Sequence, residues 1–283
     1  MTRAHEDVIR PTDAVGEMQP AKGSLHRRLI GVGIRDVRHE AAALRWAVFD
    51  ARAGQDVVQI VHAVEPVDGN RFPGWQTVCA AVEHGSRQRS SVAIIGAPRA
   101  GSAEHVLQAE SDNLALLVLG DDEPATPHRR IASHLRRTAH CPVVCVPRGT
   151  EIFEGLPVTV AADDLGLSDQ VLEFAAQYAD RHQVPLDIAR TWRSLHRDVP
   201  ADAATLAEEQ TQLDEELAGL RRSYRNLAVV SRIELDDRWL ERVRAHSSLV
   251  VVNRASAERL GMTSPLPDPL CPVAFIPDSW LGP

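Results

Sequence analysis

Apolar residues along the chain form short continuous runs that alternate with longer stretches of helical period. Short apolar runs bounded by polar residues are typical of strands that are buried on both faces. Stretches in which apolar residues recur every three or four positions indicate amphipathic helices. In the first half this pattern predicts strands at residues 28–34, 57–64, 92–95, 114–119 and 143–146, and helices at residues 39–53, 75–85, 103–110 and 131–138.

The second half repeats this order of elements. Strands are expected at residues 157–161, 186–191, 227–233, 249–252 and 273–276, and helices at residues 168–182, 201–222 and 239–245. Both halves end on a Cys-Pro-Val sequence that leads into the last strand, beginning at Cys141 and at Cys271. We interpret the chain as an internal duplication.

Alternation of doubly buried strands with helices favours a mostly parallel sheet that is covered by helices on both faces. We therefore expect an α/β fold made of two tandem, doubly wound, Rossmann-like domains of about five strands each. The domains are expected at residues 25–148 and 156–283, joined by a linker at residues 149–155. Residues 1–24 combine proline and glycine with charged residues, which predicts a disordered tail.

Composition and charge narrow the classes of function. The chain is 44% hydrophobic and 25% charged, as in ordinary globular proteins, and its formal net charge is -8. No apolar run approaches the roughly 20 residues that a membrane span requires, and no signal-peptide core precedes the first strand, so a cytoplasmic location and no membrane partner are expected. The acidic balance, without a basic cluster, argues against nucleic-acid binding.

Several short motifs resemble those of the universal stress protein family in its tandem, two-domain form. In the first half they are residues 31–36 (GVGIRD), 43–47 (ALRWA) and 61–63 (VHA). In the second half they are residues 160–164 (VAADD) and 249–253 (LVVVN), followed by the second Cys-Pro-Val sequence. The resemblance covers about residues 25–278. It implies a stress-response protein of Rossmann-like fold, with nucleotide sites at the carboxyl ends of the strands.

The nucleotide site implied by the resemblance is altered in the first half. Family members that hold ATP place an Asp at the end of the first strand and a glycine-rich phosphate loop after the fourth, whose N–H groups close on phosphate oxygens. Here Arg35 stands at the Asp position, and Gly120 is followed by three carboxylates in residues 121–123. Two unit charges about 4 Å apart repel by roughly 4 kcal/mol near a protein surface. The loop expected at residues 123–130 also contains two prolines and no glycine.

In the second half only part of the implied site persists. Asp163 occupies the first-strand position, but residues 253–256 (NRAS) replace the glycines. Prolines at positions 265, 267 and 269 oppose the helix that should follow a phosphate loop. We therefore expect neither half to bind ATP with the affinity usual in the family. The ancestral pocket positions are Arg35, Ala63, Gly120, Asp163, Thr191 and Asn253.

Three hypotheses for the function follow. The first is a non-enzymatic stress-response protein with decayed ATP sites and no cofactor, which acts through an unknown protein partner or senses an unknown small ligand. The alternative is a protein that keeps ATP or another adenine nucleotide in the second half, held through Asp163, Thr191 and Asn253. A third is an enzyme of the wider nucleotide-hydrolase-like superfamily that uses Asp163 or Asp164 with a metal. The sequence assigns no catalytic or metal-binding residue, because no nucleophile has a base placed beside it.

The resemblance implies that the last strands of the two halves, at residues 143–146 and 273–276, provide edge pairing, and unpaired edges favour association. This predicts either an intramolecular pseudo-dimer or a homo-oligomer. The acidic residues of the helix at 201–222 are interpreted as a solvated outer face, with a docking surface for a basic partner as the alternative. They are Glu208, Glu209, Asp214, Glu215 and Glu216.

Four further side chains have a structural and a functional interpretation. Arg35 could bind an anion, but a salt bridge to Asp121 or Asp122 is the favoured interpretation. Cys141 and Cys145, beside His140 and expected on one face of the last strand, could suggest metal or redox chemistry, whereas core packing is favoured. The side chain of His62 is expected to be structural.

Overall fold

The structure is a computed structural model that describes residues 27–65, 74–88, 91–121, 127–152, 154–163, 167–192, 202–235, 238–260, 262, 271–280 and 282. The predicted tail at residues 1–24 lies outside this part. So do Asp122 and Glu123 of the acidic loop, Asp164, and the prolines at 265, 267 and 269.

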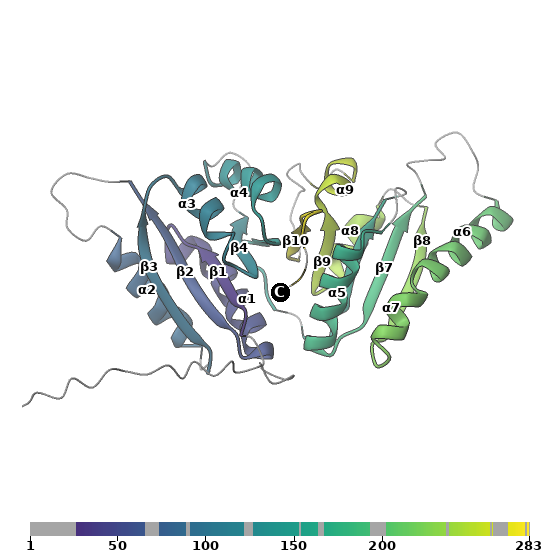
Figure 1. Cartoon of the computed structure of the whole chain (residues 1–283), viewed down its shortest axis with the longest axis horizontal. Coiled ribbons are helices and arrows are strands. Elements are labelled where there is room, and N and C mark those ends of the chain that lie inside the picture. Colours follow the sequence, from purple (N-terminus) through teal and green to yellow (C-terminus); the bar gives the residue numbers. More distant parts are fainter. Residues whose placement is uncertain are drawn as a thin grey trace, which may run out of the picture.

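One sheet of ten strands runs through the described part of the chain (Figure 1). Its order is β3-β2-β1-β4-β5-β10-β9-β6-β7-β8, and every neighbouring pair is parallel except β5 and β10. The strands are β1 (Leu29–Gly33), β2 (Val57–Val64), β3 (Ala93–Ala100), β4 (Leu116–Asp121), β5 (Val143–Pro147), β6 (Val158–Ala162), β7 (Leu186–Thr191), β8 (Val229–Glu234), β9 (Leu249–Asn253) and β10 (Val273–Ile276). The predicted α/β fold with a mostly parallel sheet is confirmed.

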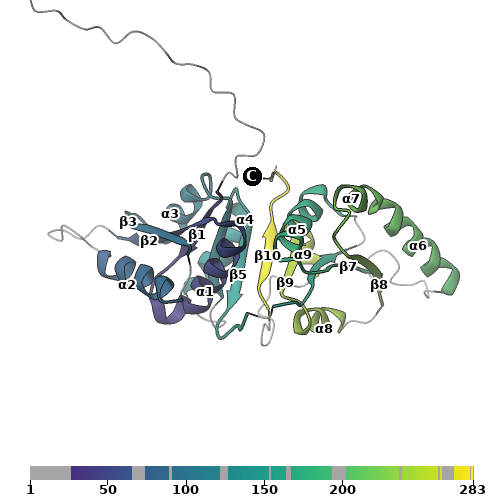
Figure 2. The ribbon, with the colours of Figure 1, turned by 90° about the horizontal axis from the view of Figure 1, so that it is seen from below.

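The strand order makes the internal duplication visible. The order β3-β2-β1-β4-β5 in the first half recurs as β8-β7-β6-β9-β10 in the second, read from the opposite end of the sheet. The two last strands meet in the centre, where Ala274 lies opposite Val144 in an antiparallel register (Figure 2). The predicted pairing of the last strands is confirmed as an intramolecular one.

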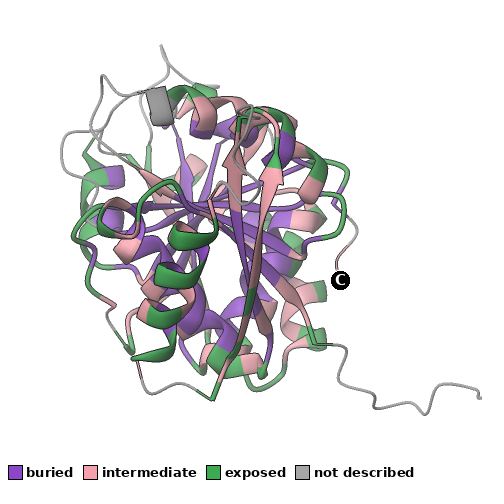
Figure 3. Cartoon of the chain, turned by 90° about the vertical axis from the view of Figure 1, so that its left-hand side faces the viewer, coloured by how far each residue is buried: buried purple, intermediate pink, exposed green. Residues whose placement is uncertain are grey.

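Helices cover both faces of the sheet, and each face has its own apolar cluster (Figure 3). One face carries α1 (Val37–Gly54), α2 (Trp75–Ser86), α5 (Asp169–His182), α6 (Ala203–Glu216) and α7 (Ala218–Ser223). The other face carries α3 (Ala103–Glu110), α4 (Pro127–Thr138), α8 (Trp239–Ala245) and α9 (Arg254–Arg259). The central strands are therefore buried on both sides, which explains their continuous apolar sequences.

The start of α1 shows how the sequence sets a helix boundary. Asp36 is the N-cap residue, and its carboxylate accepts a hydrogen bond from the Arg38 N–H at 2.7 Å. The Glu40 carboxylate reaches back to accept from the Asp36 N–H at 2.9 Å. Two of the N–H groups at the helix start are thereby satisfied, as in other capped helices.

The structure differs from the expected elements at three helices. The helix predicted at residues 201–222 is divided into α6 and α7 at Leu217, two residues before the weak helix former Gly219. Helix α4 begins at Pro127 rather than at residue 131, so the loop expected at residues 123–130 is shorter, because proline fits the first helical turn. Helix α9 follows β9 without a loop and was not expected.

Two of the acidic residues expected on a solvated outer face contact the rest of the protein. Asp214 accepts hydrogen bonds from the Ser231 hydroxyl at 2.6 Å and from Arg221 at 3.0 Å. Glu216 forms an ion pair with the buried Arg190 of β7. Glu208 and Glu215 are exposed, as expected. The acidic face is thus partly used to attach α6 to the outer strands.

Helices α1 and α5 join the two halves beside the central strands. The ring of Trp46 stacks on Tyr178 with centroids 5.9 Å apart, and Phe49 stacks on His182 at 4.9 Å. His182 also bonds to the fully buried Asp50, with 2.9 Å between Nε2 and Oδ1. We call this contact, together with the β5–β10 pair, the seam.

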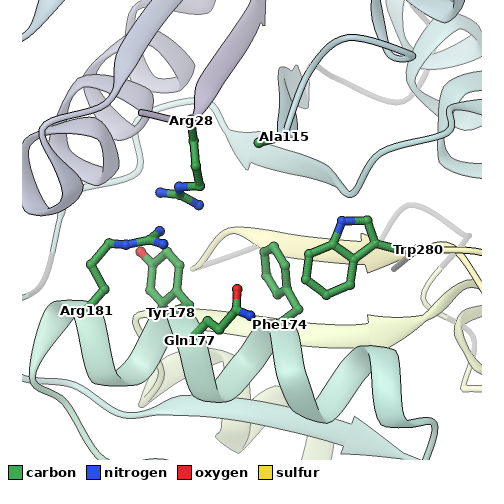
Figure 4. A pocket seen from close by; sticks show the side chains of 7 residues that line it. All are labelled: Arg28, Ala115, Phe174, Gln177, Tyr178, Arg181 and Trp280. Atoms are coloured by element: carbon green, nitrogen blue, oxygen red, sulfur yellow. The ribbon is translucent and has the colours of Figure 1, made fainter. Parts of the chain in front are cut away.

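A small cavity lies in the seam next to these aromatic rings (Figure 4). Arg28 and Ala115 of the first half face residues of α5 and the C-terminal segment, namely Phe174, Gln177, Tyr178, Arg181 and Trp280. The cavity volume is about 10 Å³, which is near the minimum for one water molecule. This part of the seam is therefore closed to larger ligands.

Among the helices of the described residues, none has the length and apolar character that a bilayer crossing would need.

Candidate functional site at the strand ends

A pocket lies at the carboxyl ends of β1, β2 and β4, covered by α3 and α4. Three of the residues predicted from the sequence, Arg35, Ala63 and Gly120, line it together. The remaining lining residues are Gly33, Ile34, Glu40, Val61, His62, Ala103, Leu107, Leu119, Ile131 and Ala132. The cavity volume is about 120 Å³. The switch point of the first half is thus where the sequence placed it.

Glu40 brings a buried carboxylate to this pocket. Its residue exposure is 6%, and it belongs to the first turn of α1. A Cβ atom built at Gly120 would lie 3.3 Å from the Glu40 Cγ, so the two residues are in direct contact. The sequence analysis missed Glu40. Its spacing of four from the N-cap Asp36 was the available signal, because a Glu near a helix start often reaches back to the cap.

Asp121 receives its ion pair from α4. Arg136 Nη2 lies 3.1 Å from Asp121 Oδ2, while Arg136 Nε donates to the Cys145 sulfur at 3.1 Å. The same guanidinium lies over the Phe275 ring, 4.6 Å from its centroid. The pair predicted for Asp121 was with Arg35, so the charge of this carboxylate is balanced by a residue that the sequence did not single out. Asp122, the other predicted partner of Arg35, lies outside the described residues.

His62 holds the strand end in place. Its Nδ1 lies 2.7 Å from the carbonyl oxygen of Ile34, which links the end of β2 to the chain after β1. This contact supports the predicted structural role of the imidazole. Asp36, one residue after Arg35, caps α1 as described above.

In the second half, the three predicted residues lie at the ends of the neighbouring strands β9, β6 and β7. Asp163 is 1% exposed, and its carboxylate forms an ion pair with the Arg259 guanidinium. Arg259 also donates to the Ser256 hydroxyl at 3.2 Å. Asp163 is thus engaged by a cation from α9. Arg259 was missed because the sequence predicted no helix at this position.

Asn253 and Thr191 complete this edge of the second half. The Asn253 side chain caps α9 by accepting from the Ala255 N–H at 2.7 Å, and its amide donates to Asp278. Thr191 is 8% exposed and ends β7 opposite Glu234 of β8. Both halves of the Asn253 amide are therefore used within the protein.

The cysteines of the last strands belong to the core. Cys141 and Cys145 are 3% and 2% exposed, and Cys141 precedes β5 rather than lying on it. Burial raises the pKa of Cys141 to about 12 and that of Cys145 to about 11, so both thiols are protonated at neutral pH. The predicted core packing is confirmed. Among the described side chains no group of three His, Cys, Asp or Glu residues is placed to hold a metal ion.

Comparison with known proteins identifies similar sequences and solved structures of similar fold. Two universal stress proteins of Mycobacterium tuberculosis, from strains H37Rv and CDC 1551, are each 27% identical to this chain over 253 residues, covering 78% of this chain and 84% of theirs. The solved structure of a universal stress protein from Archaeoglobus fulgidus superposes with a TM-score of 0.61 at 12% identity, covering 89% of this chain and 97% of that one. The chain is similar in sequence to these two universal stress proteins and similar in fold to the third.

A second solved structure has the same fold. It is a functionally unknown protein of Pseudomonas aeruginosa, with a TM-score of 0.56 at 14% identity, covering 90% of this chain and 94% of that one. No protein-family model matches the chain. The resemblance expected from the motifs is confirmed by the tuberculosis relatives, and the Archaeoglobus protein supports the fold of nearly the whole chain.

Proposed function

We propose that this relative of the universal stress proteins is a non-enzymatic stress-response protein whose two strand-end sites no longer hold ATP. It acts through a protein partner, or by binding a small ligand other than ATP. The observation that carries the proposal is that charged side chains of the chain itself occupy both sites. Glu40 lies against Gly120 in the first half, and Arg259 is paired with Asp163 in the second.

The first-half pocket lacks an excess of positive charge that could hold a polyphosphate. Binding and transfer of phosphate need cations or converging N–H groups around the oxygens. Here Arg35 and Glu40 both line the pocket and have opposite charges, and the charge of the neighbouring Asp121 is balanced by Arg136. Ligand pockets are usually about 300–1,000 Å³, so a cavity of about 120 Å³ is also small for a nucleotide.

The second-half site is closed by an ion pair. A ligand that bonds to Asp163 must displace Arg259 from a carboxylate that is 1% exposed. Leaving a buried charge without its partner is costly, so such a ligand would have to supply an equivalent cation or set of donors. Adenosine can offer its ribose hydroxyls as neutral donors, but neither it nor its phosphates carry a cation that could replace the charge of a guanidinium.

One observation favours the alternative, in which an adenine nucleotide is kept in the second half. Asp163, Thr191 and Asn253 lie on three adjacent strand ends, as a switch-point site requires. The Asn253 amide and the Asp163 carboxylate are both engaged inside the protein, which is why we place this alternative second.

The proposed partner must use a surface away from the central strands. Because β5 and β10 pair with each other, a homo-oligomer cannot form through these last strands. The outer strands β3 and β8 form the two ends of the sheet and expose Ile95 (51%) and Val230 (55%). We further propose that residues 25–148 and 156–283 are the two domains of this arrangement.

Native mass spectrometry of the full chain as purified tests the proposal. We expect the mass of the bare chain, with no adduct of nucleotide mass. An adenine-nucleotide adduct would contradict the proposal. If that adduct were absent from the Asp163→Asn variant but present in a Glu40→Gln variant, it would establish the second-half alternative. Extraction in acid and chromatography of the released small molecules identifies any adduct.

A further inference from the structure

Helix α4 of the first half lies near α9 and β10 of the second half (Figure 1). Residues of these three elements line another pocket. It is lined by Ser133, Arg136, Arg137, Arg254, Ala257, Glu258 and Phe275, and we call it the arginine pocket. Its cavity volume is about 170 Å³. It is separate from the strand-end pocket of the first half, with which it shares no lining residue.

Arg254 is held across the boundary between the two halves. It belongs to the second half, and its Nη1 and Nη2 atoms donate to the carbonyl oxygens of Arg137 and Cys141 at 3.3 and 3.2 Å. Its Nε is buried and has no hydrogen-bond partner. Burial lowers the pKa of Arg254, which means that its surroundings do not fully compensate the cation. A buried donor without an acceptor is a costly arrangement.

The charges around the arginine pocket do not cancel. Arg136 is compensated by Asp121, as described above. Within the described part of the chain, neither Arg137 nor Arg254 forms an ion pair with a carboxylate, and the acidic lining residue is the exposed Glu258. The lining residues therefore carry more positive than negative charge, and outside the lining Asp278 partly compensates Arg254 by raising its pKa.

The size of the pocket suits a small anion. A cavity of about 150 Å³ can hold a molecule of the size of benzene, and one water occupies roughly 30 Å³ of liquid. A phosphate group with one or two waters fits 170 Å³, whereas a nucleotide does not. Guanidinium groups match phosphate oxygens with paired N–H donors, and the Ser133 hydroxyl adds a further donor.

We propose that the arginine pocket binds a small phosphate-type oxyanion, held by Arg254 and Arg137 with support from Ser133 and Arg136. Because these residues come from α4 and α9, the anion contacts both halves at once. Its binding stabilises their contact in proportion to its concentration. The inference does not depend on whether the strand-end sites bind ATP.

Calorimetric titration of the full chain with inorganic phosphate tests this site, with sulfate, acetate and chloride compared at constant ionic strength. We expect saturable binding of one phosphate, weaker binding of acetate, and no binding of chloride. Arg254→Gln should weaken phosphate binding by roughly tenfold or more, since a charge-assisted pair is lost. Because Arg254 also bonds to two carbonyls, the exposed Arg137→Gln is the second variant and should weaken binding by at least about threefold.

Arg87→Gln provides the matched control. Arg87 is an exposed arginine of the first half whose ion pair is with Glu83, so its loss should leave phosphate binding unchanged. Absence of saturable phosphate binding would overturn the proposal, as would equal responses to phosphate and chloride. Unchanged affinity in both Arg137→Gln and Arg254→Gln would also overturn it. Thermal unfolding with and without phosphate provides an independent readout, and only the chains with an intact pocket should be stabilised.

Discussion

Asp50 is a fully buried carboxylate that contacts cations from both halves. Its oxygens lie 3.0 Å from Arg28 Nη2, 2.9 Å from His182 Nε2 and 3.9 Å from Arg181 Nη1. Burial alone would raise the pKa of Asp50, but the neighbouring Arg28, His182 and Arg181 hold it down at about 2. The carboxylate is therefore charged at neutral pH and acts as the common acceptor of these three side chains.

Replacing Asp50 by Asn should destabilise the protein strongly. The change removes the charged partner of His182 and one of the two carboxylates of Arg28, which keeps Asp56 at 2.7 Å, and breaking a buried pair typically costs about 3–5 kcal/mol. Urea unfolding of Asp50→Asn measures the loss. The exposed Asp112→Asn, which removes the surface contact with His140, is the control and should stay within about 0.5 kcal/mol of the parent. Equal stabilities of the two variants would show that the Asp50 cluster contributes nothing.

The same cluster predicts how stability responds to acid. The pKa of Asp50 is lowered in the folded state, from 3.8 to about 2, so its contribution is present above about pH 4 and is lost as the pH falls through about 2. The corresponding free energy is about 2 kcal/mol. The unfolding free energy of the parent should therefore fall between about pH 4 and pH 2 by more than that of Asp50→Asn. Parallel pH profiles for the two proteins would contradict the assignment.

At the strand-end sites, the sequence predicted which residues lie in the pockets better than which side chains contact them. Arg35, Ala63 and Gly120 were placed in one pocket from the order of strands alone, and the structure brings them together. The partners Glu40 and Arg259 were missed, because their roles depend on how a helix packs on the strand ends. The spacing of apolar residues shows which face of a helix is buried. It does not show which carboxylate or guanidinium elsewhere in the chain that face contacts.

At the scale of elements, Leu213 and Leu217 fix the end of α6 on the sheet. Both side chains are 0% exposed and belong to the apolar cluster that α1 and α5 also contact. Leu217 is also the residue at which α6 ends and α7 begins. The division of the predicted helix therefore occurs at a buried anchor point rather than in a solvent-exposed loop.

Leu217→Ala should destabilise the protein by about 2–5 kcal/mol, because it removes a fully buried side chain and leaves a cavity. Leu235, which follows β8 and is 48% exposed, provides the control, and Leu235→Ala should cost less than about 1 kcal/mol. Denaturant unfolding of the two variants makes the comparison. A loss below 1 kcal/mol in Leu217→Ala would mean that the break in the helix is not anchored by this residue.

Most elements were predictable from the sequence because their signals are local. Strands such as β2 and β7 are mainly apolar segments interrupted by single polar residues, and they begin and end at the predicted residues. The start of α4 and the existence of α9 were missed for a different reason. The sequence analysis places Pro127 in a loop, although proline suits a first helical turn. Helix α9 has six residues and depends on the Asn253 cap and on packing of Ala257.

At the scale of the whole molecule, the seam connects the halves by three kinds of contact. The β5–β10 pair continues the backbone hydrogen bonding, the Trp46–Tyr178 and Phe49–His182 pairs stack aromatic rings, and Asp50 bonds to His182. The duplication in the sequence predicted that the last strands would pair. It did not predict the contact of α1 with α5, because no feature in the sequence of either helix indicates which other helix it packs against.

The seam should make the two halves unfold together. Differential scanning calorimetry of the full chain should give one transition, in which the calorimetric and van't Hoff enthalpies agree. His182→Ala removes both a ring stack and the bond to Asp50, and it should broaden or split that transition. Two resolved transitions in the parent protein would show that the seam is too weak to couple the halves.

The loss of the phosphate cradle in both halves is the central claim, and titration calorimetry with Mg-ATP tests it most directly. Our account predicts no saturable heat from either strand-end site at ATP concentrations up to about 1 mM, which corresponds to binding weaker than about 4 kcal/mol. Saturable binding in the micromolar range, abolished by Asp163→Asn or by a bulky residue at Ala63, would contradict it.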